Sequence, residues 1–194
     1  MKEEVNAVVE TMSGIQGKPT ENLEALKYKV LKLKDVSRDT GINYEEVEEV
    51  RYDKVMPKYL LRKGDILFKA KSGDNIAAIV DRDVENLVAT SHFIIMRIKE
   101  EYKDEILPEY LTMYLNSEYA QEYFKARSEG SVLPIIKLST LNELEIIVPD
   151  KSEQQRLCEL YKLMLEEKVI MQKLMAAREK QVASKLREAL EKEL

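Results

Sequence analysis

The chain has 194 residues, of which 44% are hydrophobic and 35% charged, and its formal net charge is −5. This composition predicts a soluble domain with a core and an appendage, while the lack of any run of about eighteen apolar residues excludes a transmembrane helix. A single cysteine, Cys158, excludes an internal disulfide and a cysteine metal cluster. The start of the chain lacks the pattern of a signal peptide, so we expect a cytoplasmic location.

Charge is unevenly spread along the acidic chain. Between Arg51 and Asn75 there are seven Lys or Arg residues against three Asp residues, a net charge of +4. Such a stretch fits either a local basic face for nucleic acid or an ordinary solvated surface. The overall acidity argues against nucleic-acid binding, so charge alone leaves both interpretations open.

Residues 1–28 are predicted to form lead-in helices that precede the main domain. Val5, Val8, Val9 and Met12 share one helical face, and glycines and a proline then interrupt the pattern. Thr20 could cap a second, short helix. This segment is either a docking helix or simply a packed terminus.

Residues 29–150 are predicted to form a compact α+β domain. Apolar runs bounded by Gly, Asp and Ser indicate short paired strands, followed by helices that begin at Pro108 and after Asn116-Ser117. Ser139 is expected to cap a further helical turn. The expected strands are 30–36, 66–68, 76–80, 87–89, 93–96 and, after the helices, 144–148. Four tyrosines at helical spacing are expected to be core residues rather than a base-stacking platform: Tyr110, Tyr114, Tyr119 and Tyr123.

Residues 151–194 contain no Gly and no Pro and are predicted to form one helix from about Ser152, with Ser152 and Gln155 spaced as a capping box. At a rise of 1.5 Å per residue this helix would be roughly 60 Å long, too long to lie on its own domain, so it should project. The apolar residues of this helix form a stripe along one face. An apolar stripe this long favours pairing with another helix, although packing on its own domain is the alternative. The stripe consists of Leu157, Leu160, Met164, Met171 and Leu174.

The sequence carries no pattern typical of catalysis. His92 is the only histidine, which excludes a multi-histidine metal site and is more typical of a structural or ligand-contacting role than of a general base. No glycine-rich phosphate loop occurs. The order of Asp65, Lys69 and Lys71 weakly resembles the active-site strand of a nuclease, but no second acidic residue stands beside the lysines. We therefore predict no catalytic residue, no metal and no cofactor.

Four segments in order resemble the target-recognition domain of type I restriction–modification specificity subunits. They are KGDILFKAKSG (Lys63–Gly73), ATSHFIIMR (Ala89–Arg97), the stretch Leu107–Asp150, and SEQQRL (Ser152–Leu157), which opens the long helix. The resemblance covers the chain from about Lys29 onward. It implies a non-catalytic protein that lays loops into the major groove of double-stranded DNA, where base edges can be distinguished. The implied DNA-binding residues are Lys69, Lys71, Ser72, Gly73, Asn75, Ser91, His92, Arg127, Ser131 and Lys137.

In that family two such domains lie in tandem, and helices that pair in an antiparallel coiled coil set the distance between them. This chain has one domain and one helix, so the resemblance implies a half-subunit that homodimerises and reads an inverted repeat split by a spacer. The implied partners are the methyltransferase (M) and restriction (R) subunits. Two other classes remain: an assembly module that pairs through its helix without reading DNA, and, with little support, a free-standing nuclease.

Overall fold

A computed structural model describes residues 1–130 and 134–191 of the chain. Its centre is a four-stranded antiparallel sheet in the order β2-β10-β7-β8. These strands are β2 (Val9–Ser13), β7 (Ile66–Lys69), β8 (Ala77–Ile79) and β10 (Phe93–Ile98). The strands predicted at 66–68, 76–80 and 93–96 are therefore confirmed.

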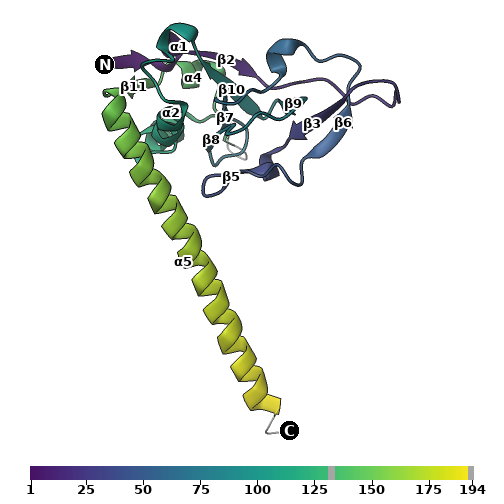
Figure 1. Cartoon of the computed structure of the whole chain (residues 1–194), viewed down its shortest axis with the longest axis vertical. Coiled ribbons are helices and arrows are strands. Elements are labelled where there is room, and N and C mark those ends of the chain that lie inside the picture. The colour runs from purple at the N-terminus through teal and green to yellow at the C-terminus, as the bar shows by residue number, and fades with distance from the viewer. Residues whose placement is uncertain (131–133, 192–194) are drawn as a thin grey trace.

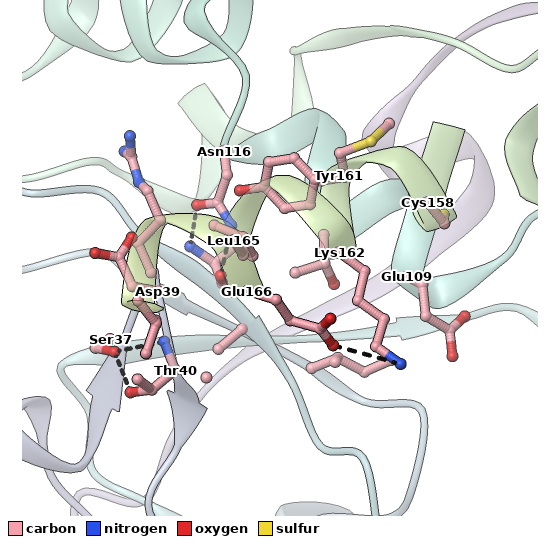
Figure 2. A pocket seen from close by; sticks show the side chains of 18 of the residues that line it. Ser37, Asp39, Thr40, Glu109, Asn116, Cys158, Tyr161, Lys162, Leu165 and Glu166 are labelled. Carbon is pink, nitrogen blue, oxygen red and sulfur yellow. Dashed lines mark hydrogen bonds and ion pairs between the residues drawn. The ribbon is translucent and has the colours of Figure 1, made fainter. Parts of the chain in front are cut away.

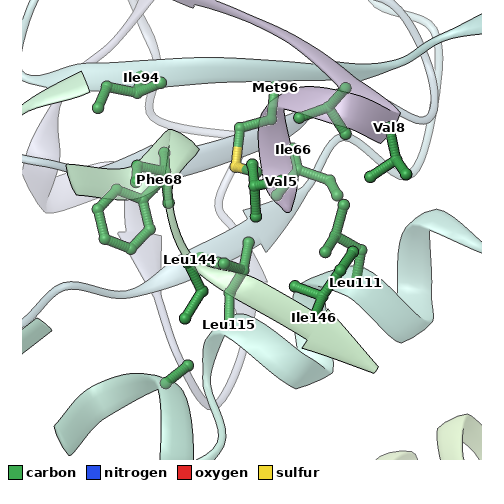
Figure 3. Close-up of a cluster of buried hydrophobic side chains, with 14 of the residues drawn as sticks. Val5, Val8, Ile66, Phe68, Ile94, Met96, Leu111, Leu115, Leu144 and Ile146 are labelled. Atoms are coloured by element: carbon green, nitrogen blue, oxygen red, sulfur yellow. The ribbon is translucent and has the colours of Figure 1, made fainter. Parts of the chain in front are cut away.

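Both faces of this main sheet are buried, which explains why its central strands read as unbroken apolar runs. Successive side chains of a strand point to opposite faces. Ile66 and Phe68 therefore pack on the face covered by helices (Figure 3), whereas Leu67 packs in the cluster on the other face. In β10, Ile94 belongs to the first cluster and Ile95 to the second, and neither face of the sheet is left to solvent.

The first face is covered by four short helices and a two-stranded sheet. The helix predicted at Pro108 has this proline at its start, and Ser117 accepts a hydrogen bond from Ala120 N at 3.4 Å as the N-cap of the next helix, so both predicted starts are confirmed. The third predicted helical turn begins after Lys137 rather than at Ser139. The covering elements are α1 (Val5–Val8), α2 (Pro108–Leu115), α3 (Glu118–Arg127), α4 (Leu138–Asn142), β1 (Lys2–Glu4) and β11 (Glu145–Ile147).

The second face is covered by a three-stranded sheet and a small hairpin. The sheet has the order β6-β3-β9, with β3 antiparallel to β6 and parallel to β9. Its strands are β3 (Lys27–Leu31), β6 (Glu48–Arg51) and β9 (Leu87–Ala89), and the hairpin is β4 (Val36–Ser37) with β5 (Gly41–Ile42). Single 3-10 turns lie at Leu33–Asp35, Pro57–Tyr59 and Glu100–Tyr102.

The prediction of lead-in helices for residues 1–28 is wrong. Only Val5–Val8 forms a helical turn, and the residues after it form β2, the edge strand of the main sheet, whose Val9 pairs with Ile98. A valine-rich segment suits either structure locally, and β10 decides the outcome by offering it a free sheet edge. The helix expected after Thr20 is a turn instead, in which Asn22 Oδ1 accepts a hydrogen bond from Glu24 N at 3.0 Å.

The tyrosine series packs inside the domain, as predicted, except at one position. Tyr110 is 4% exposed, its hydroxyl donates to Ile147 O at 2.6 Å, and burial raises its pKa to about 12. Tyr114 and Tyr123 are partly buried and their hydroxyls also donate to backbone carbonyls. Only Tyr119, at 55% exposed, faces solvent. The interpretation as a base-stacking platform therefore has no geometric support.

The last element, α5 (Lys151–Glu191), is a single helix of 41 residues that runs away from the sheets (Figure 1). The predicted long projecting helix is therefore confirmed. Its first turn is capped by Asp150, whose Oδ1 accepts from Glu153 N at 3.0 Å, rather than by the predicted capping box starting at Ser152. Within the described ranges, no helix combines the length and the apolarity needed to cross a membrane.

Gln154 anchors α5 to the domain and is its one fully buried residue. Its Oε1 accepts from Leu107 N at 2.9 Å, and its Nε2 donates to Glu105 O at 2.7 Å and to Pro149 O at 2.9 Å. Replacing Gln154 with alanine leaves these buried backbone groups unpaired, so we expect the free energy of unfolding to fall by about 2–3 kcal/mol. Denaturant titration measures it, with the exposed neighbour Gln155→Ala as a control expected within about 0.5 kcal/mol of the parent. Equal effects of the two changes would contradict the anchoring role.

Candidate nucleic-acid interface

Two of the segments predicted to contact DNA meet at one end of the main sheet. The register that pairs Phe93 with Lys69 sets the turn before β10 beside the loop after β7. His92 O accepts hydrogen bonds from Ala70 N at 3.0 Å and from Lys71 N at 3.3 Å. The loop of residues 70–76 and the turn of residues 90–92 therefore form one continuous surface.

The third predicted segment reaches the same end of the sheet. Ile136 N donates to Ala70 O at 2.9 Å, which ties the chain after α3 to the loop after β7. A Cβ atom on Gly73 would lie 3.4 Å from Pro134 Cδ, so the two segments are in contact. We call residues 70–76, 90–92 and 134–137 the loop end. Ser131, also predicted to contact DNA, lies outside the described residues.

Sequence reasoning missed a fourth part of this end, the segment that follows β2. Gly14 N donates to Phe93 O at 3.0 Å and Ile15 N donates to Ala89 O at 2.8 Å, so this segment lies against the turn of residues 90–92. Gln16 follows as an exposed polar side chain. The strand content of residues 9–13 was hidden by their helical spacing, and Gly14 was the one local signal of a close backbone approach.

Two of the predicted DNA-binding side chains are buried. Only 8% of the Lys69 side chain is exposed, and its Nζ lies 3.1 Å from Asp74 Oδ2. Asn75 is 6% exposed and has φ = 47°, in the left-handed region where asparagine is enriched among residues other than glycine. Both side chains shape the loop from inside, so a direct contact with DNA would require the loop to open. Neither side chain therefore belongs to the exposed surface of the loop end.

The other predicted residues leave polar groups at or near the surface. Gly73 has φ = +76°, which favours glycine, and carries no side chain between the loop backbone and a ligand. His92 is exposed, and Ser72 Oγ hydrogen-bonds to Asp74. Lys71 is partly exposed and makes no ion pair within the described part of the chain. Ser91 is partly exposed in the turn of residues 90–92.

Arg127 and Lys137 carry charge near the loop end but are engaged within the protein. The Arg127 guanidinium lies 4.0 Å from the centre of the Tyr123 ring, and Lys137 Nζ lies 2.8 Å from Glu129 Oε2. Both side chains are exposed, and surface contacts of this kind are weak. Replacing these contacts with contacts to DNA phosphates would therefore cost little free energy.

The basic stretch Arg51–Asn75 does not form one face. Strand β7 separates its members, since Arg62 and Lys63 precede the strand and Lys71 follows it. Lys63 N donates to Asp83 Oδ1 at 3.1 Å at the end opposite the loop end. The positive charge is therefore divided between the two ends of the strand.

Asp65 and Lys69, which faintly suggested a nuclease strand, are each committed to a structural ion pair. Asp65 is 2% exposed and accepts from Arg97 Nε and Nη2, both at 2.7 Å, and this hydrogen bonding raises the pKa of Arg97. The Cys158 thiol is partly buried, and burial followed by the negative charge of Glu109 raises its pKa, which disfavours the reactive thiolate. Across residues 1–130 and 134–191, no group of three or more His, Cys, Asp or Glu side chains is placed to hold a metal ion.

A groove of about 730 Å³ separates the first half of α5 from the domain. Figure 2 shows Ser37, Asp39 and Thr40 of the β4–β5 hairpin on one side of it and Tyr161 and Leu165 of α5 on the other. The ion pair between Lys168 Nζ and Asp39 Oδ1, at 2.8 Å, bridges the two sides. None of the five residues of the predicted pairing stripe, Leu157, Leu160, Met164, Met171 and Leu174, lines this groove.

The sequence profile of the type I restriction modification DNA specificity domain matches residues 20–162. The chain therefore belongs to this family, and the resemblance seen in the sequence is confirmed. It is 30% identical over 118 residues to the type I restriction enzyme HindI specificity subunit of Haemophilus influenzae, covering 59% of this chain and 25% of that protein. It is 42% identical over 55 residues to the MjaIX specificity subunit of Methanocaldococcus jannaschii, covering 28% of this chain and 13% of that protein.

Solved structures show the same fold. The HsdS subunit of Thermoanaerobacter tengcongensis superposes with a TM-score of 0.70 at 17% identity, over 93% of this chain and 46% of that one. The S subunit of a type I system from M. genitalium superposes with a TM-score of 0.56 at 17% identity, over 86% and 39%. The chain thus spans less than half the length of these relatives. The predicted α+β domain with a long C-terminal helix is confirmed, whereas pairing of that helix stays a prediction.

Proposed function

We propose that this chain recognises a specific DNA sequence as the target-recognition half of a type I restriction–modification specificity subunit. The observation that carries the proposal is the loop end, where three segments that are distant in sequence are joined by backbone hydrogen bonds. Ala70 lies at the junction, with its N–H bonded to one segment and its carbonyl to another. Loops fixed on a rigid sheet present polar groups in a defined arrangement, which sequence readout in the major groove requires.

Within this surface we assign two kinds of contact. Lys71, Arg127 and Lys137 would neutralise phosphates and so position the domain on any duplex. Ser72, Ser91 and His92 would reach base edges, because they carry hydrogen-bonding groups on the loop and turn themselves. The backbone at Gly73 could approach the DNA closely, since no side chain intervenes.

The long helix supports the second part of the proposal, that two copies pair and read the two halves of a bipartite site. Leu160, Met164 and Met171 are 65%, 48% and 56% exposed, and such a row of apolar side chains is stabilised by a partner helix. A two-fold dimer would present two identical loop ends to an inverted repeat separated by a spacer. Methyltransferase and restriction subunits would then act at the site that the dimer selects.

Selection of bound duplexes from a random DNA pool, with the methyltransferase partner present, tests the proposal. We expect enrichment of an inverted repeat with a spacer of fixed length. Enrichment of a single, unrepeated site would contradict the dimer and retain recognition. Binding without any sequence enrichment would contradict recognition and favour the assembly module.

Lys71→Ala should weaken binding to every duplex by a similar factor and lower the slope of log K against log salt by about 0.9, the amount expected for one lost phosphate contact. Lys63→Ala removes the same charge at the opposite end of β7 and is the matched control, with an unchanged slope expected. Titrations of labelled duplex at several salt concentrations measure both. Equal losses for the two variants would show a long-range charge effect instead of a contact.

A further inference from the structure

The pairing face of α5 carries two charged residues whose neighbours three and four positions along the helix are all uncharged. With 3.6 residues per turn, Glu167 and Arg178 lie about three turns apart on the same face as Leu160 and Met171. The residues three and four positions from Glu167 are Leu163, Met164, Ile170 and Met171. Those around Arg178 are Leu174, Met175, Gln181 and Val182.

Neither charge forms an ion pair with another residue that the structure describes. Both side chains are exposed, and in the described part of the chain neither makes an ion pair. Other charges of α5 do pair along the helix, such as Arg156 with Glu153 at 2.6 Å and Lys162 with Glu166 at 3.8 Å. Glu167 and Arg178 are therefore opposite charges placed singly within an apolar stripe, which is typical of residues that set the register of a helix pair.

We propose that α5 pairs with α5 of a second copy, antiparallel, about a two-fold axis between Gln172 and Lys173, so that Glu167 of each copy meets Arg178 of the other. This inference rests on the dimer of the proposed function and adds its register. The axis lies near the middle of the helix Lys151–Glu191, so the two helices overlap along nearly all of their length.

The same register brings apolar residues together next to the axis. Met171 faces Leu174 of the second copy, and both side chains are at least 44% exposed in the single chain. The two Met171–Leu174 contacts form an apolar centre flanked on each side by one ion pair between Glu167 and Arg178, beyond which Met164 falls opposite Gln181. Lys185 falls opposite Leu160, where its aliphatic stem can cover the leucine while its ammonium group stays in water.

The domain also has a groove that the C-terminal part of the second copy's α5 could contact. A shallow groove of about 510 Å³ is lined by Met113 of α2 together with Leu160, Leu163, Met164 and Glu167 of α5. In the proposed register the second copy's helix passes this groove near its Val182. Glu167 is one of the residues that line the groove, so the ion pair would form beside these apolar contacts.

A neighbouring register of the same two helices is the main alternative, and it determines which variant serves as the control. Moving the axis by half a heptad, to residue 176, would bring Glu167 against Lys185 of the second copy and leave Arg178 on Leu174. Reversal of the charge at 178 disrupts only the proposed register, whereas reversal at 185 disrupts only the competitor. Lys185→Glu is thus a matched control for Arg178→Glu.

Sedimentation equilibrium of the full chain tests the register. We expect the parent to be dimeric, Glu167→Arg and Arg178→Glu each to raise the dimer dissociation constant about tenfold or more, and Lys185→Glu to change it little, because each single reversal turns two attractive contacts into two repulsive ones. An equimolar mixture of Glu167→Arg and Arg178→Glu, and the doubly reversed chain, should both regain the parental affinity. Far-ultraviolet circular dichroism verifies that the variants, all at exposed helical positions, remain folded.

Three outcomes of this experiment would contradict different parts of the proposal. A parent chain that stays monomeric at high concentration overturns the dimer itself and with it this proposal. A dimeric parent weakened by Lys185→Glu and not by Arg178→Glu overturns the register alone. A mixture that pairs more tightly than the parent, with single variants equal to the parent, indicates parallel helices and also overturns the register.

Discussion

Replacing Asp65 with alanine should lower the free energy of unfolding by about 3–5 kcal/mol, the range for breaking a buried ion pair. The carboxylate is 2% exposed and closes the turn before β7 by accepting from Arg62 N at 2.9 Å. It also holds Arg97 of β10 through two hydrogen bonds of 2.7 Å. Its loss would leave the Arg97 guanidinium, whose side chain is only 18% exposed, without its counter-charge.

Asp83→Ala is the matched control for this prediction. Asp83 lies on the same side of the domain and is exposed, and it accepts a single hydrogen bond from Lys63 N. Its removal should cost at most about 1 kcal/mol. Denaturant titrations compare the two, and the double variant Asp65→Ala/Arg97→Ala should be less destabilised than the sum of its single changes. Additive effects, or equal losses for Asp65 and Asp83, would show that the ion pair contributes little.

The second large effect is expected at Gly14. A Cβ atom there would lie 2.3 Å from Thr90 O and 2.4 Å from Ala89 O, and neither backbone atom can move without breaking the contact of β9 with β3. Gly14→Ala should therefore cost about 3 kcal/mol or more, at the upper end of the range for overpacking. It should also disturb the turn of residues 90–92 and so weaken DNA binding, because Gly14 N bonds to Phe93 O.

Gly17→Ala separates the steric cost from the general effect of replacing a glycine. At Gly17 the nearest atom to an added Cβ is a ring carbon of Tyr52 at 3.4 Å, which is an ordinary contact. We expect a change within about 0.5 kcal/mol, or slight stabilisation through the unfolded chain. Thermal and denaturant unfolding measure both variants. A mild Gly14→Ala would mean that residues 14–15 can move away from the sheet and that their packing against Thr90 is not essential.

The strands β7 and β10 of the main sheet could be predicted because their sequences alone decide them. Ile66–Lys69 and Phe93–Ile98 are β-branched and aromatic runs between turn residues, and no helical alternative competes. Pro108 and Ser117 mark their helices equally well, since each satisfies or removes an N–H group at a helix start. These signals act over a few residues and favour one secondary structure, so tertiary contacts did not have to choose between a helix and a strand in these segments.

The N-terminal segment could not be predicted in the same way. Val9–Ser13 has helical spacing and β-branched residues together, and its state is decided by pairing with β10, which lies far away in the sequence. Long-range pairing is not visible in a local pattern. The same limit applies to the site: Lys69 and Asn75 have suitable chemistry for DNA, but only the packing of the loop shows that they are buried.

What the sequence by itself determined was the family, the α+β domain, the projecting helix and the apolar stripe along it, because these depend on periodicity, helix caps and ordered motifs. What only the tertiary structure decided was which segments meet. Backbone hydrogen bonds at Ala70 and Phe93 bring the loop end together, and the buried pair of Asp65 with Arg97 fixes β7 against β10. Such contacts join groups distant in the chain, and their energies depend on burial that exists only once the core has formed.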